Sequence, residues 1–265
     1  MKFADLNGVG LRYELAGQGG RDVVVIHEMG GLLEAWDEVV PELRKGNRVL
    51  RYDTRGAGLS EKIKGELKIE TMADDLAALL DHVKITGPVV VAGVAVGAAI
   101  GICFASRYAS RTAGLVAMSP ALDVPAEVRQ ERLDRLKKIE AGGMRTIFEG
   151  AMDNDYPQNL RDLSLPRFEH FRARWLSNDP ESFCTIFRML IAMDLNAAMA
   201  SIRCPTLVVG GQFDKGRPPA YTEAVSKKIP GAKFKGLQSG HQMEVQTPDL
   251  VIATINEFLA GLPKP

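Results

Sequence analysis

A strand followed by a sharp, glycine-flanked turn and a helix is the most distinctive chemical feature of this sequence. The segment Val89–Gly101 begins with a β-branched run, places Ala95 between Gly93 and Gly97, and continues in residues suited to a helix. A side chain at the centre of such a turn is held in a strained conformation that only small neighbours tolerate. The turn would present one side chain for chemistry, but a methyl group cannot attack a carbonyl carbon.

Proton transfer near neutral pH calls for a histidine, and the chain has four. His241 lies in a loop ahead of the C-terminal helix and is the strongest candidate for a general base and acid. His82 lies on a predicted helix and His170 in a helical stretch, so both are expected to be surface or packing residues. His27 follows a predicted strand and is expected to shape its loop, with a contact to substrate as the alternative.

The turn around Ala95 resembles the G-x-S-x-G nucleophile elbow of the α/β-hydrolase superfamily, with alanine in the place of serine. The segment Val24–Gly31 is similar to the strand and H-G-x-G-type oxyanion loop of that family. Glu28 stands where the family usually has glycine. A carboxylate pointing into this loop would repel a developing oxyanion, whereas one pointing outward would not.

Two further regions carry the resemblance to the end of the chain. The segment Asp53–Ser60 matches the family's D-x-R-G-x-G-x-S turn, in which Asp53 and Arg55 are expected to stabilise the fold. The segments Val208–Asp214 and Ser239–His241 look like those that bear the triad acid and histidine. The resemblance therefore covers the chain apart from residues 122–201, and it implies an α/β-hydrolase fold.

The resemblance also implies the roles of individual residues. The backbone N–H groups of Met29 and Val96 would form the oxyanion hole. His241 would be the general base and acid, and Asp214 would hold its tautomer and stabilise the imidazolium. Asp123, just after another predicted strand, is an alternative triad acid because some family members take the acid from that position.

Alanine at the nucleophile position leaves three functional hypotheses open. A serine has been replaced by Ala95 in an otherwise intact hydrolase, or the natural protein uses His241 to activate water without a covalent intermediate. In the second case Glu28 is a candidate proton donor or base. The third hypothesis is a non-catalytic, ligand-binding sensor or receptor on the same fold.

Clues to the substrate come from residues 122–201 and from the resemblance. This segment is rich in arginines, whose guanidinium groups could bind a substrate carboxylate through two hydrogen bonds. We expect Arg172 and Trp175 to contact the substrate. In size and cap position the chain resembles the enol-lactonase and ring-cleavage (C–C bond) hydrolase branch. This implies a small, carboxylated or cyclic carbonyl substrate such as an ester, lactone or ring-cleavage product. No dinucleotide fingerprint or metal motif is present, so we expect neither a cofactor nor a metal.

The elements that must position these residues follow from hydrophobic periodicity. Residues 2–15 indicate two short strands around the turn Asn7-Gly8. Continuous apolar runs, typical of strands buried in a parallel sheet, occur at residues 23–26, 88–92, 114–118 and 206–209. Residues 69–83 and 251–262 repeat apolar positions at helical spacing. The alternation predicts an α/β protein with a doubly wound, mostly parallel sheet.

One region interrupts this alternation. Between residues 122 and 201 four amphipathic helical patterns occur without a convincing strand, at residues 128–139, 144–152, 168–175 and 183–193. We interpret residues 122–201 as a helical cap inserted into a core formed by residues 1–121 and 202–265.

Composition excludes several classes of partner. The 33 basic and 33 acidic residues balance, so nothing favours nucleic acid or an anionic membrane, and a small molecule is the expected partner. The three cysteines fit no disulfide framework or zinc site, and no apolar run is long enough for a membrane span. We expect a cytoplasmic protein, either a monomer or a homodimer.

Overall fold

The computed structural model describes residues 1–122, 124 and 126–263, and its centre is a mostly parallel sheet. Eight strands among the described residues follow the order β1-β2-β4-β3-β5-β6-β7-β8. Their bounds are Lys2–Leu6, Val9–Ala16, Asp22–Ile26, Arg48–Tyr52, Val89–Val94, Thr112–Met118, Thr206–Gly211 and Lys233–Leu237 for β1 to β8. Strand β2 pairs antiparallel with β1 and β4, and all other pairs are parallel. The predicted doubly wound α/β architecture is confirmed.

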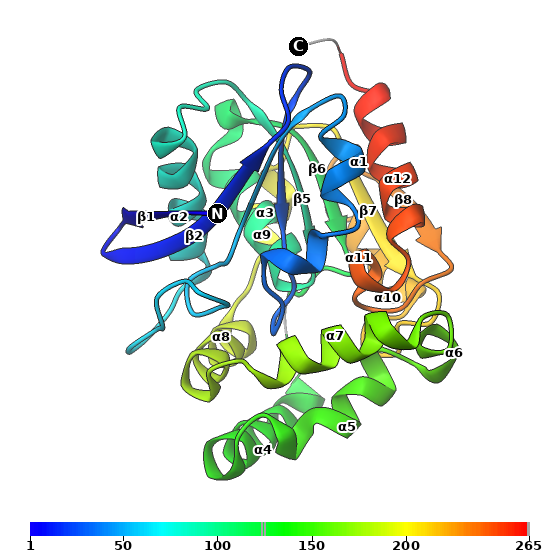
Figure 1. Ribbon diagram of the computed structural model, residues 1–265. Helices are drawn as coiled ribbons and strands as arrows, with labels where there is room; N and C mark the ends of the chain where they lie inside the picture. Colours follow the sequence, from blue (N-terminus) through cyan, green and yellow to red (C-terminus); the bar gives the residue numbers. More distant parts are fainter. Residues whose placement is uncertain (123, 125, 264–265) are drawn as a thin grey trace.

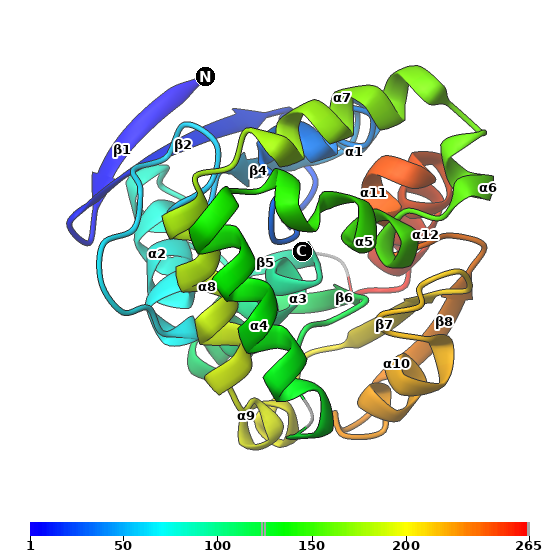
Figure 2. The ribbon, with the colours of Figure 1, turned by 90° about the horizontal axis from the view of Figure 1, so that it is seen from below.

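Helices cover both faces of this sheet. Helices α2 (Ile69–His82) and α3 (Val96–Arg107) pack against each other on one face, where α10 (Pro219–Ser226) also lies against β7. Helices α1 (Val40–Leu43) and α12 (Pro248–Ala260) lie on the other face, close to α11 (Met243–Gln246) (Figure 2). Two 3-10 helices, η1 (Leu33–Trp36) and η2 (Ala109–Arg111), complete the core. Among the described residues no helix is both long and apolar enough to cross a membrane.

The described part of the stretch between β6 and β7 consists of helices joined by loops, without a strand. It contains α4 (Ala126–Gly142), α5 (Arg145–Asp155), α6 (Gln158–Arg161), α7 (Leu165–Leu176), α8 (Pro180–Ala192) and α9 (Asn196–Ser201). Helices α4, α5, α7 and α8 lie together across one end of the sheet (Figure 1). The four amphipathic patterns read from the sequence correspond to these four helices. The cap boundaries at residues 122 and 201 stay a prediction.

Local sequence explains where these elements form. Strand β5 is buried along its whole length, as a β-branched run in the middle of a parallel sheet should be. Helix α8 begins after Asp179, whose carboxylate accepts a hydrogen bond from the Ser182 N–H, and Pro180 occupies its first turn. Strand β8 was not predicted because it is a largely exposed edge strand with two lysines, and lacks the apolar run of the central strands.

The close approach of α3 to the sheet is set by two glycines. A Cβ at Gly93 would overlap the backbone of Gly97, and a Cβ at Gly97 would overlap the carbonyl groups of Ile26 and His27. Neither glycine has a positive φ, so both are required by the closeness of the backbones and not by their conformation. The N-terminus of α3 therefore lies directly against the ends of β3 and β5.

We predict that Gly93→Ala lowers the free energy of unfolding by about 1–3 kcal/mol, because the added methyl group must displace the α3 backbone. Gly236→Ala on β8 is the matched control, since open space surrounds a Cβ at that strand glycine. Its stability should change by less than about 0.5 kcal/mol in urea unfolding. Equal losses in both variants would show that α3 can move away from the sheet at little cost.

Candidate active site

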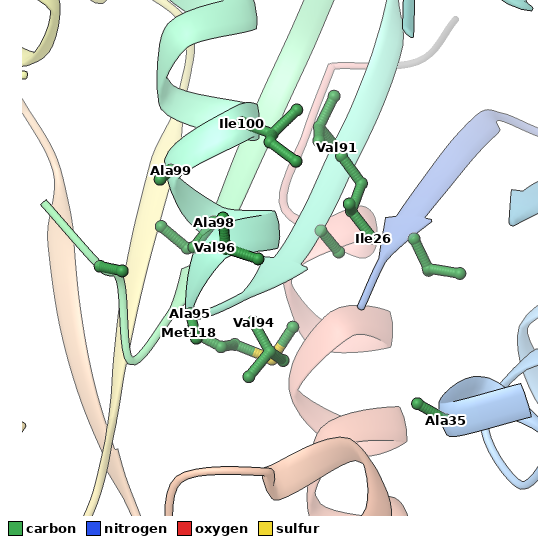
Figure 3. Close-up of a cluster of buried hydrophobic side chains, with 14 of the residues drawn as sticks. Ile26, Ala35, Val91, Val94, Ala95, Val96, Ala98, Ala99, Ile100 and Met118 are labelled. Atoms are coloured by element: carbon green, nitrogen blue, oxygen red, sulfur yellow. The ribbon is translucent and has the colours of Figure 1, made fainter. Parts of the chain in front are cut away.

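Ala95 occupies a strained backbone conformation at the junction of β5 and α3. Its φ of 51° and ψ of −109° are disfavoured for a residue with a Cβ, and strain of this kind costs about 1–3 kcal/mol. Three backbone hydrogen bonds hold the residue: its N–H donates to Met118 at 2.9 Å, and its carbonyl accepts from Ala99 and Ala121, both at 3.1 Å. Figure 3 shows Ala95 at the end of β5 beside the apolar side chains of Val94 and Met118. The geometry of a nucleophile elbow is thus present without a nucleophile.

Two backbone segments meet beside Ala95. Val96 is the first residue of α3, and the first N–H groups of a helix have no acceptor within the helix. Met29 belongs to the loop that follows β3, and both residues line the same cavity as Ala95. This arrangement suits the predicted oxyanion hole, because the helix dipole adds positive potential at Val96. The assignment of the two N–H groups stays a prediction.

His241 and Asp214 form a buried acid–base pair. The His241 Nδ1 lies 2.7 Å from the Asp214 Oδ2, and their side chains are 7% and 0% exposed. Burial alone lowers the pKa of His241, but the charge of Asp214 and its hydrogen bond outweigh burial and raise that pKa overall. Burial raises the pKa of Asp214, and the interaction with His241 outweighs it, so the pKa of Asp214 falls. Asp214 is therefore an ionised anchor for the imidazole.

The second ring nitrogen of His241 faces Arg217. With Nδ1–H donated to Asp214, Nε2 is free to accept, and the Arg217 Nη1 lies 3.4 Å from it. The backbone N–H of Arg217 donates to Asp214 Oδ1 at 2.8 Å, so the arginine is tied to the same pair. Sequence reasoning missed Arg217. Its position three residues after Asp214 was the only signal.

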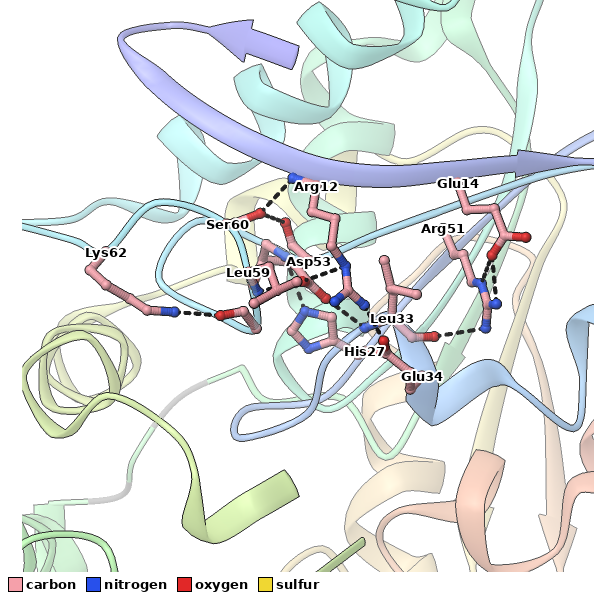
Figure 4. Close-up of polar contacts among 12 residues, drawn as sticks. Arg12, Glu14, His27, Leu33, Glu34, Arg51, Asp53, Leu59, Ser60 and Lys62 are labelled. Carbon is pink, nitrogen blue, oxygen red and sulfur yellow. Dashed lines mark hydrogen bonds and ion pairs between the residues drawn. The ribbon is translucent and has the colours of Figure 1, made fainter. Parts of the chain in front are cut away.

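The turn Asp53–Ser60 acts as a structural brace. Buried Asp53 accepts hydrogen bonds from the N–H groups of Leu33 and Leu59, both at 2.8 Å, and pairs with Arg12 (Figure 4). Arg55 pairs with Asp75 on α2 at 2.6 Å. These contacts agree with the expected role in stabilising the fold.

His27 holds the loop that follows β3 by both ring nitrogens. Its Nδ1 lies 2.7 Å from the Glu28 carbonyl, and its Nε2 accepts from the Thr54 N–H at 3.0 Å. Neither His27 nor Glu28 is among the residues that line the cavity. Their contact with substrate stays a prediction that this arrangement does not support, whereas the loop-shaping role of His27 is visible in its contacts.

A cavity of about 380 Å³ lies between the sheet and helices α4, α5, α7 and α8. Ala95, Met29, Val96, His241 and Arg217 line its floor. Apolar residues from the helical segment form much of its wall: Val128, Ile147, Ala151, Trp175, Phe183, Phe187, Leu190 and Met193. The cavity therefore brings the elbow and the acid–base pair to one space, although they are 146 residues apart in the chain.

Two further arginines, Arg132 and Arg135 of α4, also line the cavity and were not among the predicted site residues. They lie on a helix whose charged residues alternate in sign, a pattern that is typical of a solvent-exposed helix face. Burial lowers the pKa of the Arg135 guanidinium, and Arg135 makes no ion pair with any described residue. Of the two predicted contact residues, Trp175 lines the cavity, whereas Arg172 packs over the Phe148 ring outside it.

The remaining candidates are easily placed. Asp123 lies outside the described residues, so the alternative triad acid stays a prediction. Cys103 is buried in α3, where burial raises its pKa to about 12, which makes it a poor nucleophile. Among the residues that the structure describes, no three potential ligands gather to hold a metal.

Comparison with known proteins supplies the family. The family model described as "Serine aminopeptidase, S33" matches residues 20–243. The chain belongs to this family of α/β-hydrolases.

Solved structures agree with this membership. An enol-lactonase from Burkholderia xenovorans superimposes with a TM-score of 0.91 and 27% identity, covering 98% of this chain and all of its own. A thermophilic esterase from Thermogutta terrifontis, with malate bound, superimposes with a TM-score of 0.89 and 29% identity over 95% and 93% of the two chains. The 3-oxoadipate enol-lactonase 2 of Acinetobacter baylyi is 23% identical over 91% of this chain and 89% of its own. Together with the family, these relatives support a hydrolase for small carbonyl compounds.

We predict that Asp214→Asn lowers the pKa of His241, because the aspartate raises it by charge and by hydrogen bonding. Histidine NMR titration of this hydrolase measures the change, with exposed His170 as an internal control that should not shift. A raised folded-state pKa contributes stability that is present below the unfolded value and lost as pH rises through the folded value. The variant should therefore lose this pH-dependent contribution, and an unchanged His241 titration would contradict the assignment.

Proposed function

We propose that this α/β-hydrolase hydrolyses a small, carboxylated or cyclic carbonyl compound, an ester or a lactone, with water as the nucleophile. The observation that carries the proposal is the buried His241–Asp214 pair facing the cavity that Ala95 also lines. A histidine anchored in this way is prepared for proton transfer, whether or not a hydroxyl stands at the elbow.

The chemistry follows from the placement of the groups. Neutral His241 would accept a proton at Nε2 from a water beside Ala95, and the resulting hydroxide would attack the substrate carbonyl carbon. The N–H groups of Met29 and Val96 would stabilise the tetrahedral oxyanion. The His241 imidazolium would return its proton to the leaving oxygen as the carbon–oxygen bond breaks. Asp214 stabilises the imidazolium throughout but stays ionised.

Arginines in the cavity support a carboxylated substrate. Arg132, Arg135 and Arg217 line it against a single described acidic residue there, Asp155. The half-buried Arg135 guanidinium forms no ion pair with a described residue, so a ligand carboxylate would stabilise it, and its planar fork favours bidentate binding. The malate bound to the Thermogutta terrifontis esterase is a small dicarboxylate, so it shares the carboxylate but not the ester or lactone group of the substrate proposed here.

We predict that Ala95→Ser introduces labelling by a fluorophosphonate probe and raises turnover of small esters and lactones. The strained elbow, the helix N-terminus and His241 already have the arrangement that a serine needs. The chain as given should turn over the same panel slowly, and His241→Gln should abolish this activity. An inert Ala95 chain that binds lactones tightly would favour the ligand-binding sensor instead.

We predict that Arg135→Met weakens binding of a small dicarboxylate about 10–100-fold, as expected for the loss of hydrogen bonds between charged groups. Arg188→Met on α8 is the matched control, because Arg188 is paired with Glu140 and lies outside the cavity. Titration calorimetry on the chain as given needs no turnover. Equal affinities for both variants would exclude Arg135 from carboxylate recognition.

A further inference from the structure

The carboxyl group of Glu28 is buried behind the oxyanion loop. The side chain is 1% exposed and folds over Gly31, where a Cβ would overlap the carboxyl atoms. The Glu28 carbonyl meanwhile accepts the Gly31 N–H at 3.1 Å, which closes the loop into a tight turn. Glu28 thus projects from the loop that bears Met29, but away from the cavity.

A second carboxyl group meets it there. Glu244, on α11 three residues after His241, is 0% exposed. Burial raises the pKa of the Glu244 carboxyl group, and Glu28 is close enough to raise it further by its charge. No other described residue donates a hydrogen bond to any of the four carboxyl oxygens. Two buried carboxylates without such a donor would repel each other in this poorly solvated space, which favours a proton on one of them.

The charged groups around Glu244 do not replace a proton as the means of reducing this repulsion. Helix α11 packs against α7, η1 and α12. Arg174 on α7 is the cation that acts on Glu244, and its influence on the pKa is smaller than that of burial and Glu28. Arg167 on α7 is already paired with Glu38, which follows η1, and the buried Tyr156 is neutral at ordinary pH. Asp249 on α12 acts by its charge on Arg167 and is not among the groups that shift the pKa of Glu244.

We infer that Glu28 and Glu244 share one proton, and that this carboxyl–carboxylate bond ties the oxyanion loop to the segment bearing His241. Both glutamates are then positioning residues: they hold the Met29 N–H in register with the imidazole but touch no substrate. This role in catalysis rests on the proposed function, whereas the shared proton does not. Loss of the proton at alkaline pH would set two negative charges against each other and loosen the loop.

The sign of the pH dependence follows from burial. Burial and the charge of Glu28 raise the pKa of Glu244 well above its ordinary value. The folded chain therefore holds a proton that the unfolded chain releases near pH 4–5. The contribution of this proton to stability is complete below the unfolded pKa and is lost as pH rises through the folded pKa.

Glu244→Gln tests the shared proton in the chain as given. The amide keeps the size of the side chain and donates to Glu28 without a titratable proton. Melting temperatures should be measured from pH 5 to pH 9. The difference between the melting temperature of Glu244→Gln and that of the parent should increase in favour of the variant as pH rises. Glu223 is an exposed residue of α10 that pairs with Lys227, and the melting temperature of the control variant Glu223→Gln should change with pH in parallel with that of the parent. A Glu244→Gln profile parallel to that of the parent would overturn the shared proton.

The positioning role is tested in the Ala95→Ser background by the pH dependence of fluorophosphonate labelling. With Glu28 and Glu244 intact, labelling should decline at alkaline pH, and Glu244→Gln should abolish this decline. Glu244→Leu should slow labelling at every pH, on the order of tenfold to hundredfold, as expected when an oxyanion donor is misplaced. Equal labelling in all three forms would overturn the positioning role. If Ala95→Ser itself stays inert, the predicted oxyanion hole and the positioning role fail together, while the melting profiles still decide the shared proton. Loss of the proposed function would instead appear as a chain with Ala95 that turns over no ester or lactone.

Discussion

The active-site geometry depends on one backbone contact, the approach of α3 to the ends of β3 and β5 where Gly93 and Gly97 have no Cβ. This contact fixes Ala95 in its strained conformation and directs the N-terminus of α3 toward the cavity. It also places α3 against the carbonyls of Ile26 and His27, immediately before the oxyanion loop. The elbow and the loop are thereby held in a fixed relation, which the stabilisation of an oxyanion requires.

The strain at Ala95 persists although no hydroxyl there benefits from it. Strain survives only where the surrounding structure determines the conformation, and here the buried β5, the glycine contact and the hydrogen bonds to Met118 and Ala121 do so. The His241–Asp214 pair is preserved beside it in the same cavity. Pairing is required for the fold as well, because either group buried without its partner would be strongly destabilising.

Ionisable groups on either side of the oxyanion loop are arranged differently. Toward the cavity, His241 is paired with a carboxylate and Arg217, and three arginines favour an anionic ligand. Behind the loop, Glu28 and Glu244 form a pair without a described donor. A glutamate in the loop after β3 is therefore compatible with a hydrolase, since its buried carboxyl group does not line the cavity.

Local sequence alone determined the central parallel strands, the amphipathic helices and the glycine-flanked turn around Ala95, because periodicity and turn chemistry are short-range properties. The brace around Asp53 followed from the family resemblance. Resemblance added the roles of His241 and Asp214, and the observed 2.7 Å contact agrees with them. Only the tertiary structure decided that Arg132 and Arg135 enter the cavity, since a charged helix face has the same pattern in solvent or over a pocket. It alone decided that Glu28 turns from the cavity to Glu244, because residues 216 positions apart meet only through folding.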